Sequence, residues 1–307
     1  MMIGILLLLS IKTQAQLNFA LNQLFKPNVR LRYQVMANSN MGNDTLKLGY
    51  QQASIAGVLP LGGNVSASLQ KLELKAHQSF LNVQLGARVV QFPFLQQSQN
   101  IGNATVGFTH LRGQVGKGVW AYTAQVGAIA NQDNPSNLNP FAIVGLVKIR
   151  VKGLRKQNIL GLGAGVNGGQ FFVAPIIGWN RKLAKKWDIA ILLPVQIGIT
   201  YKHNKKLLFE WSNNFSAFAF RVSPNIARYS DARTSLETTW KVGKWAQLML
   251  EVGGAYYQNV RLQNTDRTVE IGWFRAQKLG FTPFASVGLR LQLEGGFMSS
   301  QIFESGL

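Results

Sequence analysis

A two-residue alternation of side-chain character runs along almost the whole chain and constrains the fold more than any other feature. In GVWAYTAQVGAIA (118–130), Trp120 and Tyr122 fall on one face of an extended strand, and Thr123 and Gln125 fall on the other. Successive side chains of a strand point to opposite sides, so this segment has one apolar face and one small, partly polar face without charge. A half-exposed strand of a soluble sheet normally shows strongly polar residues to water. The Trp120 face is therefore predicted to meet lipid, and the Gln125 face to point inward.

Segments with the same alternation follow one another from residue 28 to residue 293. The clearest are NVRLRYQVM (28–36), FLNVQLGARVV (80–90), PFAIVGLVKIRV (140–151) and ASVGLRLQL (285–293). Weaker examples lie at 45–59, 64–76, 103–112, 158–167, 171–180, 187–201, 206–213, 233–242 and 245–257. Turn-like pieces separate many of them, among them NSNMGND (38–44), PLGGN (60–64), NQDNPSNLN (131–139), NRKLAKK (180–186) and KHNKK (202–206). Many segments approach the ~9–11 residues with which a tilted strand crosses a bilayer.

A closed membrane barrel accounts for this pattern better than the other all-β architectures. A soluble sandwich needs one charged, wetted face, and a propeller needs blade repeats, which the sequence lacks. In a bilayer every backbone polar group must pair, so a sheet of such strands has to close on itself. The sequence predicts an all-β fold: a single closed antiparallel transmembrane β-barrel of about 12, alternatively about 14, strands. A secreted β-sandwich is the alternative, and it would lack the apolar outer band.

The N-terminus has the pattern of a secretory signal. In MMIGILLLLSIKTQAQ, an apolar run (2–9) precedes the small residues Thr13 and Ala15, which suit a cleavage site ahead of Gln16. No Lys or Arg precedes the run, and it is too short to cross a bilayer as a helix. The predicted organisation is a signal peptide (1–15), a periplasmic N-terminal segment (16–27), the outer-membrane barrel (28–297) and a C-terminal tail (298–307). Export to the outer membrane of a Gram-negative cell is the expected localisation.

Aromatic residues gather near the predicted strand ends, where an interfacial girdle is expected. Amphipathic rings favour the boundary between hydrocarbon and headgroups, because one edge is apolar and the other can form hydrogen bonds. The tryptophans assigned to the girdle are Trp120, Trp179, Trp187, Trp240, Trp245 and Trp273.

The chain is strongly basic although few of its residues are charged. It has 32 Lys and Arg against 12 Asp and Glu, a net charge of +20, and a charged fraction of only 14%. Several cations alternate with apolar residues on predicted strands and are therefore expected in the barrel lumen: Arg30, Arg32, Arg88, Lys148, Arg150 and Arg290. Their expected partners, which they outnumber, are the strand carboxylates Glu73, Glu210, Glu237 and Glu251.

Three interpretations of the basic residues remain open from the sequence. The lumen is either filled by a structural network, in which arginines bridge backbone groups and carboxylates, or it is a water-filled pore that prefers small anions. In the third interpretation, Lys and Arg of the turns bind the phosphates of lipopolysaccharide. Nucleic acid would also suit this charge, but the chain has no basic helix or nucleic-acid motif, so we expect no nucleic-acid partner.

No constellation of residues points to catalysis or to a metal. The histidines His77, His110 and His203 occupy separate segments without metal-ligand spacing, and the chain has no cysteine. His77 and Ser79 share a strand face, but such a pair is common by chance, and catalytic triads are recognised by geometry. GLGAGVNGG (161–169) has no helix after it, so its glycines indicate a strand rather than a nucleotide site. The sequence therefore predicts no enzyme activity, no metal and no cofactor.

Two segments of the C-terminal half share an arrangement of strand, basic turn and Trp-led strand. APIIGWNRKLAKKWDIAILLPVQIGITYKHNKKLLFEWS (174–212) contains it, and RTSLETTWKVGKWAQLMLEVGGAYYQN (233–259) repeats it with a tight turn. Together with the Thr13-Gln14-Ala15-Gln16 junction, these segments make residues 28–294 resemble an uncharacterised outer-membrane β-barrel family common in Bacteroidota, a domain of unknown function. The resemblance implies a membrane barrel and brings no catalytic residues. The chain ends in ESGL, without the terminal aromatic residue typical of outer-membrane assembly signals.

The expected function is a structural or passive transport role in the outer membrane, with an anion-preferring pore and a basic lumen as its specific form. A subunit of a secretion or surface-assembly complex is an alternative and would show large exposed apolar or basic patches on the periplasmic side. A lipid-modifying enzyme is a further alternative and would need a clustered Ser, His and acid. The expected partners are outer-membrane lipid, lipopolysaccharide and small anions, and the sequence defines no protein partner.

Overall fold

The computed structural model of the chain describes residues 27–41, 44–68, 73–91, 98–114, 118–131, 134–151, 156–167, 169–222, 225–264 and 281–293. These residues form fourteen β-strands. The first seven are β1 (Asn28–Met41), β2 (Asp44–Ser68), β3 (Glu73–Gln91), β4 (Gln99–Gln114), β5 (Gly118–Asn131), β6 (Asn134–Val151) and β7 (Lys156–Asn167). The others are β8 (Gln170–Lys182), β9 (Trp187–Leu193), β10 (Gln196–Lys202), β11 (Leu207–Val222), β12 (Asn225–Lys241), β13 (Ala246–Asn264) and β14 (Thr282–Gln292).

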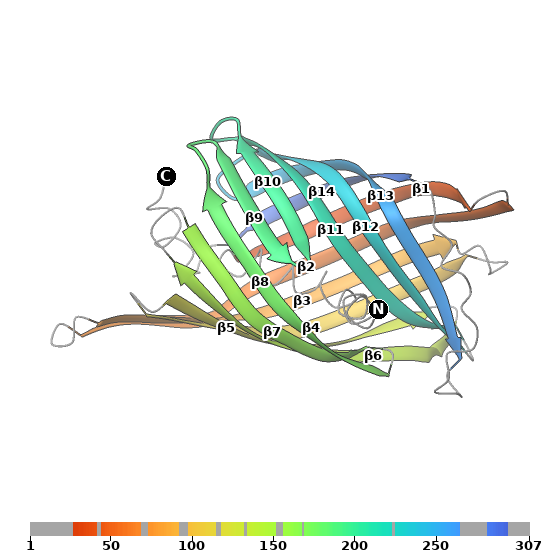
Figure 1. Cartoon of the computed structure of the whole chain (residues 1–307), viewed down its shortest axis with the longest axis horizontal. Coiled ribbons are helices and arrows are strands. Elements are labelled where there is room, and N and C mark those ends of the chain that lie inside the picture. Colours follow the sequence, from red (N-terminus) through yellow and green to blue (C-terminus); the bar gives the residue numbers. More distant parts are fainter. Residues whose placement is uncertain are drawn as a thin grey trace.

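Each strand pairs in antiparallel fashion with its sequence neighbours, and β14 pairs with β1, so the sheet closes into a barrel (Figure 1). In the closing pair, Arg30 lies opposite Arg290. The predicted single closed antiparallel transmembrane barrel is confirmed, and the strand number is that of the fourteen-strand alternative. Closure removes the open edge that a bilayer does not tolerate.

Several predicted segment boundaries differ from the structure, and the predicted turns NSNMGND (38–44) and NQDNPSNLN (131–139) lie largely within strands. PLGGN (60–64) lies inside β2, where a register shift between Pro60 and Gly62 marks an irregularity against β3 instead of a turn. Conversely, the predicted segment 187–201 contains two short strands, β9 and β10, joined at Pro194 and Val195. Glycine and proline mark bulges as readily as they mark turns, so their presence alone does not place a strand end.

The barrel has two ends that differ in their connections. The backbone N–H of Leu293 donates to the carbonyl of Pro27 at 2.9 Å, so both ends of the described chain meet at one end of the barrel, which we call the terminal end. The described turns there are 183–186, 203–206 and 242–245. The opposite, distal end has the two longest connections, 92–98 and 265–281, together with five connections of two residues each.

The outer face of the wall is apolar. On β5, Tyr122 is 43% and Val126 is 60% exposed, whereas Gln125 on the other face is 6% exposed. The Trp120 face of this segment therefore points outward. Similar exposed side chains on other strands are Leu31, Tyr33, Ile55, Leu85, Val106, Phe108, Val144, Leu146, Leu160, Leu162, Phe171, Ile177, Leu236, Leu250, Val252 and Val287. A contiguous apolar surface of this extent is unsuited to water and suited to hydrocarbon.

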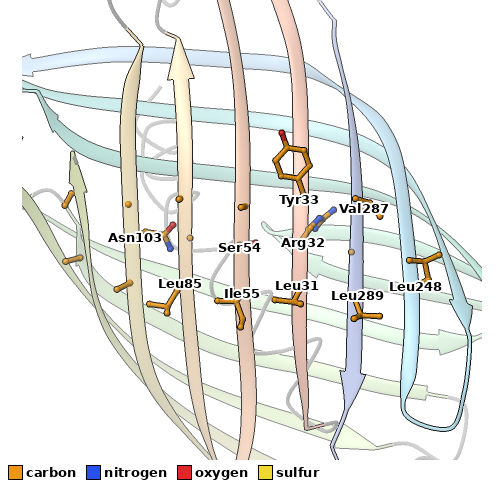
Figure 2. Close-up of a pocket in the computed structure, with 18 of the residues that line it drawn as sticks. Leu31, Arg32, Tyr33, Ser54, Ile55, Leu85, Asn103, Leu248, Val287 and Leu289 are labelled. Carbon is orange, nitrogen blue, oxygen red and sulfur yellow. The ribbon is translucent and has the colours of Figure 1, made fainter. Parts of the chain in front are cut away.

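A shallow depression of about 970 Å³ crosses this outer face. Leu31 lies opposite Leu289 on β14 and opposite Ile55 on β2, and Ile55 lies opposite Leu85 on β3, so the four side chains form one row (Figure 2). Small side chains lower the surface beside this row: Ala53, Ala87, Ala104, Ala128 and Ala130. Acyl chains, rather than a water-soluble ligand, match a depression of this composition on the outer wall.

Two clusters of buried apolar side chains fill much of the interior. One contains Met36, Tyr50, Val90, Ile101, Ile129, Phe141, Ile143, Phe172, Ala227, Tyr229, Ala255 and Phe284. The other contains Val58, Phe80, Leu111, Val119, Ala121, Val147, Ile149, Ile176, Leu192 and Val195. Opposite walls also touch, since the Asn139 side chain on β6 donates to the Ala219 carbonyl on β11 at 2.9 Å, and these strands are not neighbours in the sheet. The interior is therefore narrow, and its polar space lies to one side.

Several predictions fall on residues outside the described ranges. The predicted signal peptide (1–15), the C-terminal tail (298–307) and Trp273 are among them, as is the N-terminal segment up to residue 26. Within the ranges that are described, no helix is long and apolar enough to cross a membrane.

Candidate functional site

A polar cavity of about 500 Å³ occupies one side of the lumen. Its basic lining residues are Arg30, Arg32, Arg233 and Arg290, and its acidic lining residues are Glu210, Glu237 and Glu251. Uncharged polar side chains complete the wall: Asn28, Gln34, Gln52, Ser54, Gln84, Gln196, Thr200, Ser212, Asn214, Ser216, Ser235 and Gln292. The inward faces of β1, β2 and β10 to β14 supply most of this lining, while the inward faces of β4 to β8 supply most of one apolar cluster.

The structure places four of the six predicted lumen cations on the inner face. Arg30, Arg32 and Arg290 line the cavity. Arg88 lies farther toward the distal end, where its guanidinium donates to Gln52 Oε1 through Nε at 3.1 Å and through Nη2 at 2.6 Å.

Lys148 and Arg150 lie on the outer face, so their assignment to the lumen is wrong. Leu146, two residues before Lys148 on the same face of β6, is 41% exposed, whereas Val147 on the opposite face is 2% exposed. The Lys148 Nζ lies 4.8 Å from the ring centre of Trp120, whose strand face is also outward.

The assignment failed because both faces of β6 are apolar over most of their length. Phe141 and Ile143 alternate with Ala142 and Val144, so the period of two does not reveal which face meets lipid. The Phe141 face packs into an interior cluster. The other face is outward, and its cations lie close to the end of the strand, where a membrane surface offers polar headgroups.

Ion pairs join strands that lie two positions apart in the cavity wall. The Arg32 guanidinium pairs with the Glu251 carboxylate, and its Nε donates to Ser286 Oγ at 3.1 Å. The Ser286 hydroxyl donates in turn to Glu251 Oε2 at 2.9 Å. The guanidinium of Arg290 lies 4.0 Å from the Glu237 carboxylate. These carboxylates were among the predicted partners, and the side chain of Glu73, another of them, is outside the described set.

Arg30 is the cavity arginine that forms no ion pair among the described residues, although Glu210 and Glu237 lie close enough to attract it. Its Nε is buried and has no hydrogen-bond partner. Its neighbour in the closing strand pair is Arg290, which carries the same charge. An arginine held in this way at a cavity wall gains a partner when an anion enters, because unsatisfied buried N–H groups are costly.

A second layer of inner residues lies toward the distal end, and Arg88 is the member of it that the sequence analysis had singled out. The guanidiniums of Arg88 and Arg233 lie 5.1 Å and 5.2 Å from the ring centre of Tyr50. Arg233 also pairs with Asp231, to which the Tyr229 hydroxyl donates at 2.8 Å. Because β2 and β12 are not neighbours in the sheet, the contact between Tyr50 and Arg233 narrows the lumen at this level.

The sequence contained a signal for this layer. Asp231 and Arg233 are two residues apart and therefore share a strand face, but the predicted strand began only at residue 233. Tyr50 stood in a predicted strand without a charged neighbour on its face that would have drawn attention to it. Only the approach of β12 to β2 across the lumen brings the three residues together.

The described girdle tryptophans all lie near the terminal end. Trp187, Trp240 and Trp245 are 45%, 52% and 62% exposed. Trp120 and Trp179 are half-buried on outward strand faces. Tyr201 joins them, with its ring centre 4.7 Å from that of Trp187.

The histidine and glycine motifs show no catalytic or metal-binding arrangement in the described parts of the chain. Ser79 Oγ lies 3.0 Å from His110 Nδ1 on the outer side of the wall, so the partner of Ser79 is His110 and not His77. The carboxylates with described side chains line the inner side, and no described group of three His, Asp or Glu side chains could hold a metal. In the glycine-rich strand β7, a side chain at Gly165 would meet the Phe172 ring at 2.6 Å, which explains the small residue there.

Similarity to a family model identifies the chain's relatives. The model described as "Domain of unknown function (DUF6268)" matches residues 63–292. The chain belongs to this family. The match extends from the second half of β2 to the end of β14, so the DUF6268 region is most of the barrel. No curated protein is significantly similar to the sequence.

Solved structures with a related outline have low sequence identity to this chain. The COG4313 outer membrane channel from Pseudomonas putida F1 has a TM-score of 0.43 and 8% identity, over 87% of this chain and 96% of the other. The translocator domain of the autotransporter NalP from Neisseria meningitidis has a TM-score of 0.35 and 7% identity, over 92% and 95%. OprB from Pseudomonas putida has a TM-score of 0.32 and 11% identity, over 92% and 97%.

Proposed function

We propose that this DUF6268 barrel is an outer-membrane protein that admits small polar solutes to a narrow lumen, with a modest preference for anions. The observation that carries the proposal is the polar cavity of about 500 Å³, with arginines on β1 and β14 and glutamates on β11, β12 and β13. Charged groups stabilise an interior less than apolar groups of similar volume do, so packing alone does not explain them. A path for polar solutes through the lumen explains these charged groups.

The outer membrane is the proposed location because a closed barrel with an apolar outer face suits a bilayer. The apolar run at the N-terminus fits export. An origin in Bacteroidota is proposed only from the resemblance of the sequence.

The anion preference is modest because the outward placement of Lys148 and Arg150 leaves fewer cations inside. The inner cations include Arg30, Arg32, Arg88, Lys202, Arg228, Arg233 and Arg290. The described inner carboxylates are Asp188, Glu210, Asp231, Glu237 and Glu251, and most of them pair with these cations. Arg30 is thus the inner cation on which anion selectivity should depend most.

Conductance of the refolded full chain in a planar bilayer tests this proposal. We expect small, steady channels whose reversal potential in a salt gradient indicates anion preference. Arg30→Gln should reduce the ratio of anion to cation permeability about twofold or more, since it removes the cavity arginine that forms no ion pair among the described residues. Lys205→Gln is the matched control, because it removes the same charge from an exposed turn and should leave the ratio unchanged. A folded barrel without any channel activity would contradict the proposal.

A closed structural barrel is the second candidate, and the packed interior favours it. Apolar clusters and the Tyr50–Arg233 contact narrow the lumen toward the distal end. If this layer closes the lumen completely, the unmodified chain conducts nothing and Tyr50→Ala opens a channel. If the layer is only a constriction, Tyr50→Ala increases a conductance that is already present.

A further inference from the structure

Five cations form a patch on the outer wall that the lumen does not use. They are Arg112 on β4, Lys148 and Arg150 on β6, Lys156 on β7 and Arg181 on β8. Arg112, Arg150, Lys156 and Arg181 are exposed, and Lys148 is half-buried. We call this set the outer basic patch.

Strand register brings the members of the outer basic patch together. Arg112 lies opposite Trp120, and Trp120 lies opposite Lys148, so the three occupy one row across β4, β5 and β6. Lys156 lies opposite Arg181 on the next pair of strands. The 4.8 Å contact of the Lys148 ammonium with the Trp120 ring holds this cation beside the aromatic girdle.

The outer basic patch has no protein counter-charge among the described side chains. The carboxylates with described side chains belong to the inner side: Asp188, Glu210, Asp231, Glu237 and Glu251. Asp188, the one closest in sequence to the patch, pairs with Lys202 at 2.9 Å. None of the five patch cations forms an ion pair within the described part of the chain. Adjacent cations without a counter-charge repel one another and attract an external anion.

The patch lies at the height of lipid headgroups. On β8 the outward side chains run from Val173 and Ile177, both exposed, through Trp179 to Arg181 at the terminal end. On β6 the exposed Leu146 is followed at the next outward position by Lys148. This order of apolar, aromatic and basic side chains along a strand is typical of a strand that passes from the hydrocarbon region to the phosphate headgroups.

The end of the barrel that carries the patch indicates the leaflet. Both ends of the described chain lie at the terminal end, where the described turns have four residues each. The two longest connections, of seven and seventeen residues, lie at the distal end, although the other five connections there have two residues each. Long loops of outer-membrane barrels face the exterior, so the two long connections assign the distal end to the exterior and the terminal end to the periplasm. The periplasmic leaflet consists of glycerophospholipids, whereas lipopolysaccharide occupies the external leaflet.

We propose that the outer basic patch binds the phosphate of anionic glycerophospholipids from the periplasmic leaflet. Arg112 and Arg181 supply planar donors that match phosphate oxygens, and Lys148 and Lys156 supply mobile ammonium groups. Trp120 packs beside the glycerol region of the same lipid. The proposal differs from the sequence-based expectation of lipopolysaccharide contacts, and it does not depend on whether the lumen conducts.

Lipid retention measured by native mass spectrometry tests the proposal. The refolded full chain is presented with equal amounts of phosphatidylglycerol, phosphatidylcholine and lipopolysaccharide in detergent. The patch variant carries Lys148→Gln, Arg150→Gln, Lys156→Gln and Arg181→Gln, and the control variant carries Lys185→Gln, Lys205→Gln, Lys206→Gln and Lys244→Gln in the exposed turns. Both variants lose the same net charge. Heat-modifiable migration confirms that each one has folded.

We expect the unmodified chain to retain phosphatidylglycerol in preference to the other two lipids. The patch variant should retain at least about tenfold less phosphatidylglycerol, because each basic side chain near a membrane surface contributes appreciably to the binding of anionic lipid. The control variant should stay within about twofold of the unmodified chain. Equal losses in both variants would show only diffuse attraction and overturn the proposal. Preferential retention of lipopolysaccharide, or no loss in the patch variant, would overturn it as well.

Discussion

At the scale of single residues, the lumen depends on pairs rather than on isolated charges. Arg32 and Glu251 pair across β1 and β13, and Ser286 on the strand between them bonds to both. When one partner of a buried ion pair is removed, the remaining charge is still desolvated but no longer has the attraction that offset this cost. The pairs therefore stabilise the barrel and also reduce the charge that a solute meets.

Glu251→Gln should lower the free energy of unfolding by about 2 kcal/mol, because it leaves Arg32 without its carboxylate. The effect stays below that of a fully buried pair, since the Arg32 side chain is 28% exposed. Urea unfolding in lipid vesicles measures it. The double variant Arg32→Gln with Glu251→Gln is the control and should recover most of the loss. If it were less stable than Glu251→Gln alone, the pair would not be the cause.

At the scale of elements, the two faces of β6 show how a strand finds its orientation. Phe141, Ile143 and Val147 pack inward, and Val144 and Leu146 are exposed on the outer face, although all five are apolar. The inward choice follows from neighbouring strands, because Val119 and Ala121 of β5 belong to the same interior cluster as Val147. The interior clusters therefore decide which face of an apolar strand points inward. The charged side chains near the end of the strand then take the side that this orientation gives them.

Val144→Arg tests this orientation. Val144 is 55% exposed on the outer side of β6, and an arginine at the bilayer midplane should cost about 2–4 kcal/mol. Asn158→Arg is the matched control, because Asn158 is exposed on the outer face opposite Arg150, at headgroup height, where the cost should be about 0–1 kcal/mol. Unfolding from vesicles measures both. If Val144→Arg lowered the free energy of unfolding no more than Asn158→Arg does, the result would argue against Val144 lying on the lipid-facing side of β6.

At the scale of the whole molecule, charge is divided between the two sides of the wall. Inner cations meet inner carboxylates, and outer cations near the terminal end meet none among the described side chains. Much of the basic excess in the sequence can then serve the membrane surface rather than the lumen. The direction of the barrel in the membrane decides which surface that is.

Single cysteine variants determine this direction, because the chain has no cysteine of its own. Ser98 is exposed at the distal end and Lys205 is exposed in a turn at the terminal end. We expect a membrane-impermeant maleimide to label Ser98→Cys in intact cells, and to label Lys205→Cys only after the outer membrane is permeabilised. The reverse pattern would place the terminal end outside and would assign the outer basic patch to the external leaflet.

The amino-acid sequence was sufficient to predict the class of fold and much of the inner surface. Alternation with a period of two and uncharged faces required a closed sheet in lipid, because neither water nor an open edge suits such strands. It also brought Arg30, Arg32, Arg88 and Arg290 to the inner side, since each lies between clearly outward apolar residues such as Leu31 and Leu289. The local pattern of side chains was sufficient to identify the inward face wherever the two faces of a strand differed in polarity.

Tertiary structure alone decided the orientation of β6, the pairing inside the lumen and the closeness of its walls. Lys148 and Arg150 lie on the outer side because Val147 and Ile149, on the other face of β6, pack into an apolar interior cluster. The Tyr50–Arg233 contact depends on β2 and β12 approaching each other across the lumen, a distance that no local period encodes. A pattern along one strand reports the difference between its two faces, whereas which face is inside depends on every strand that shares the interior.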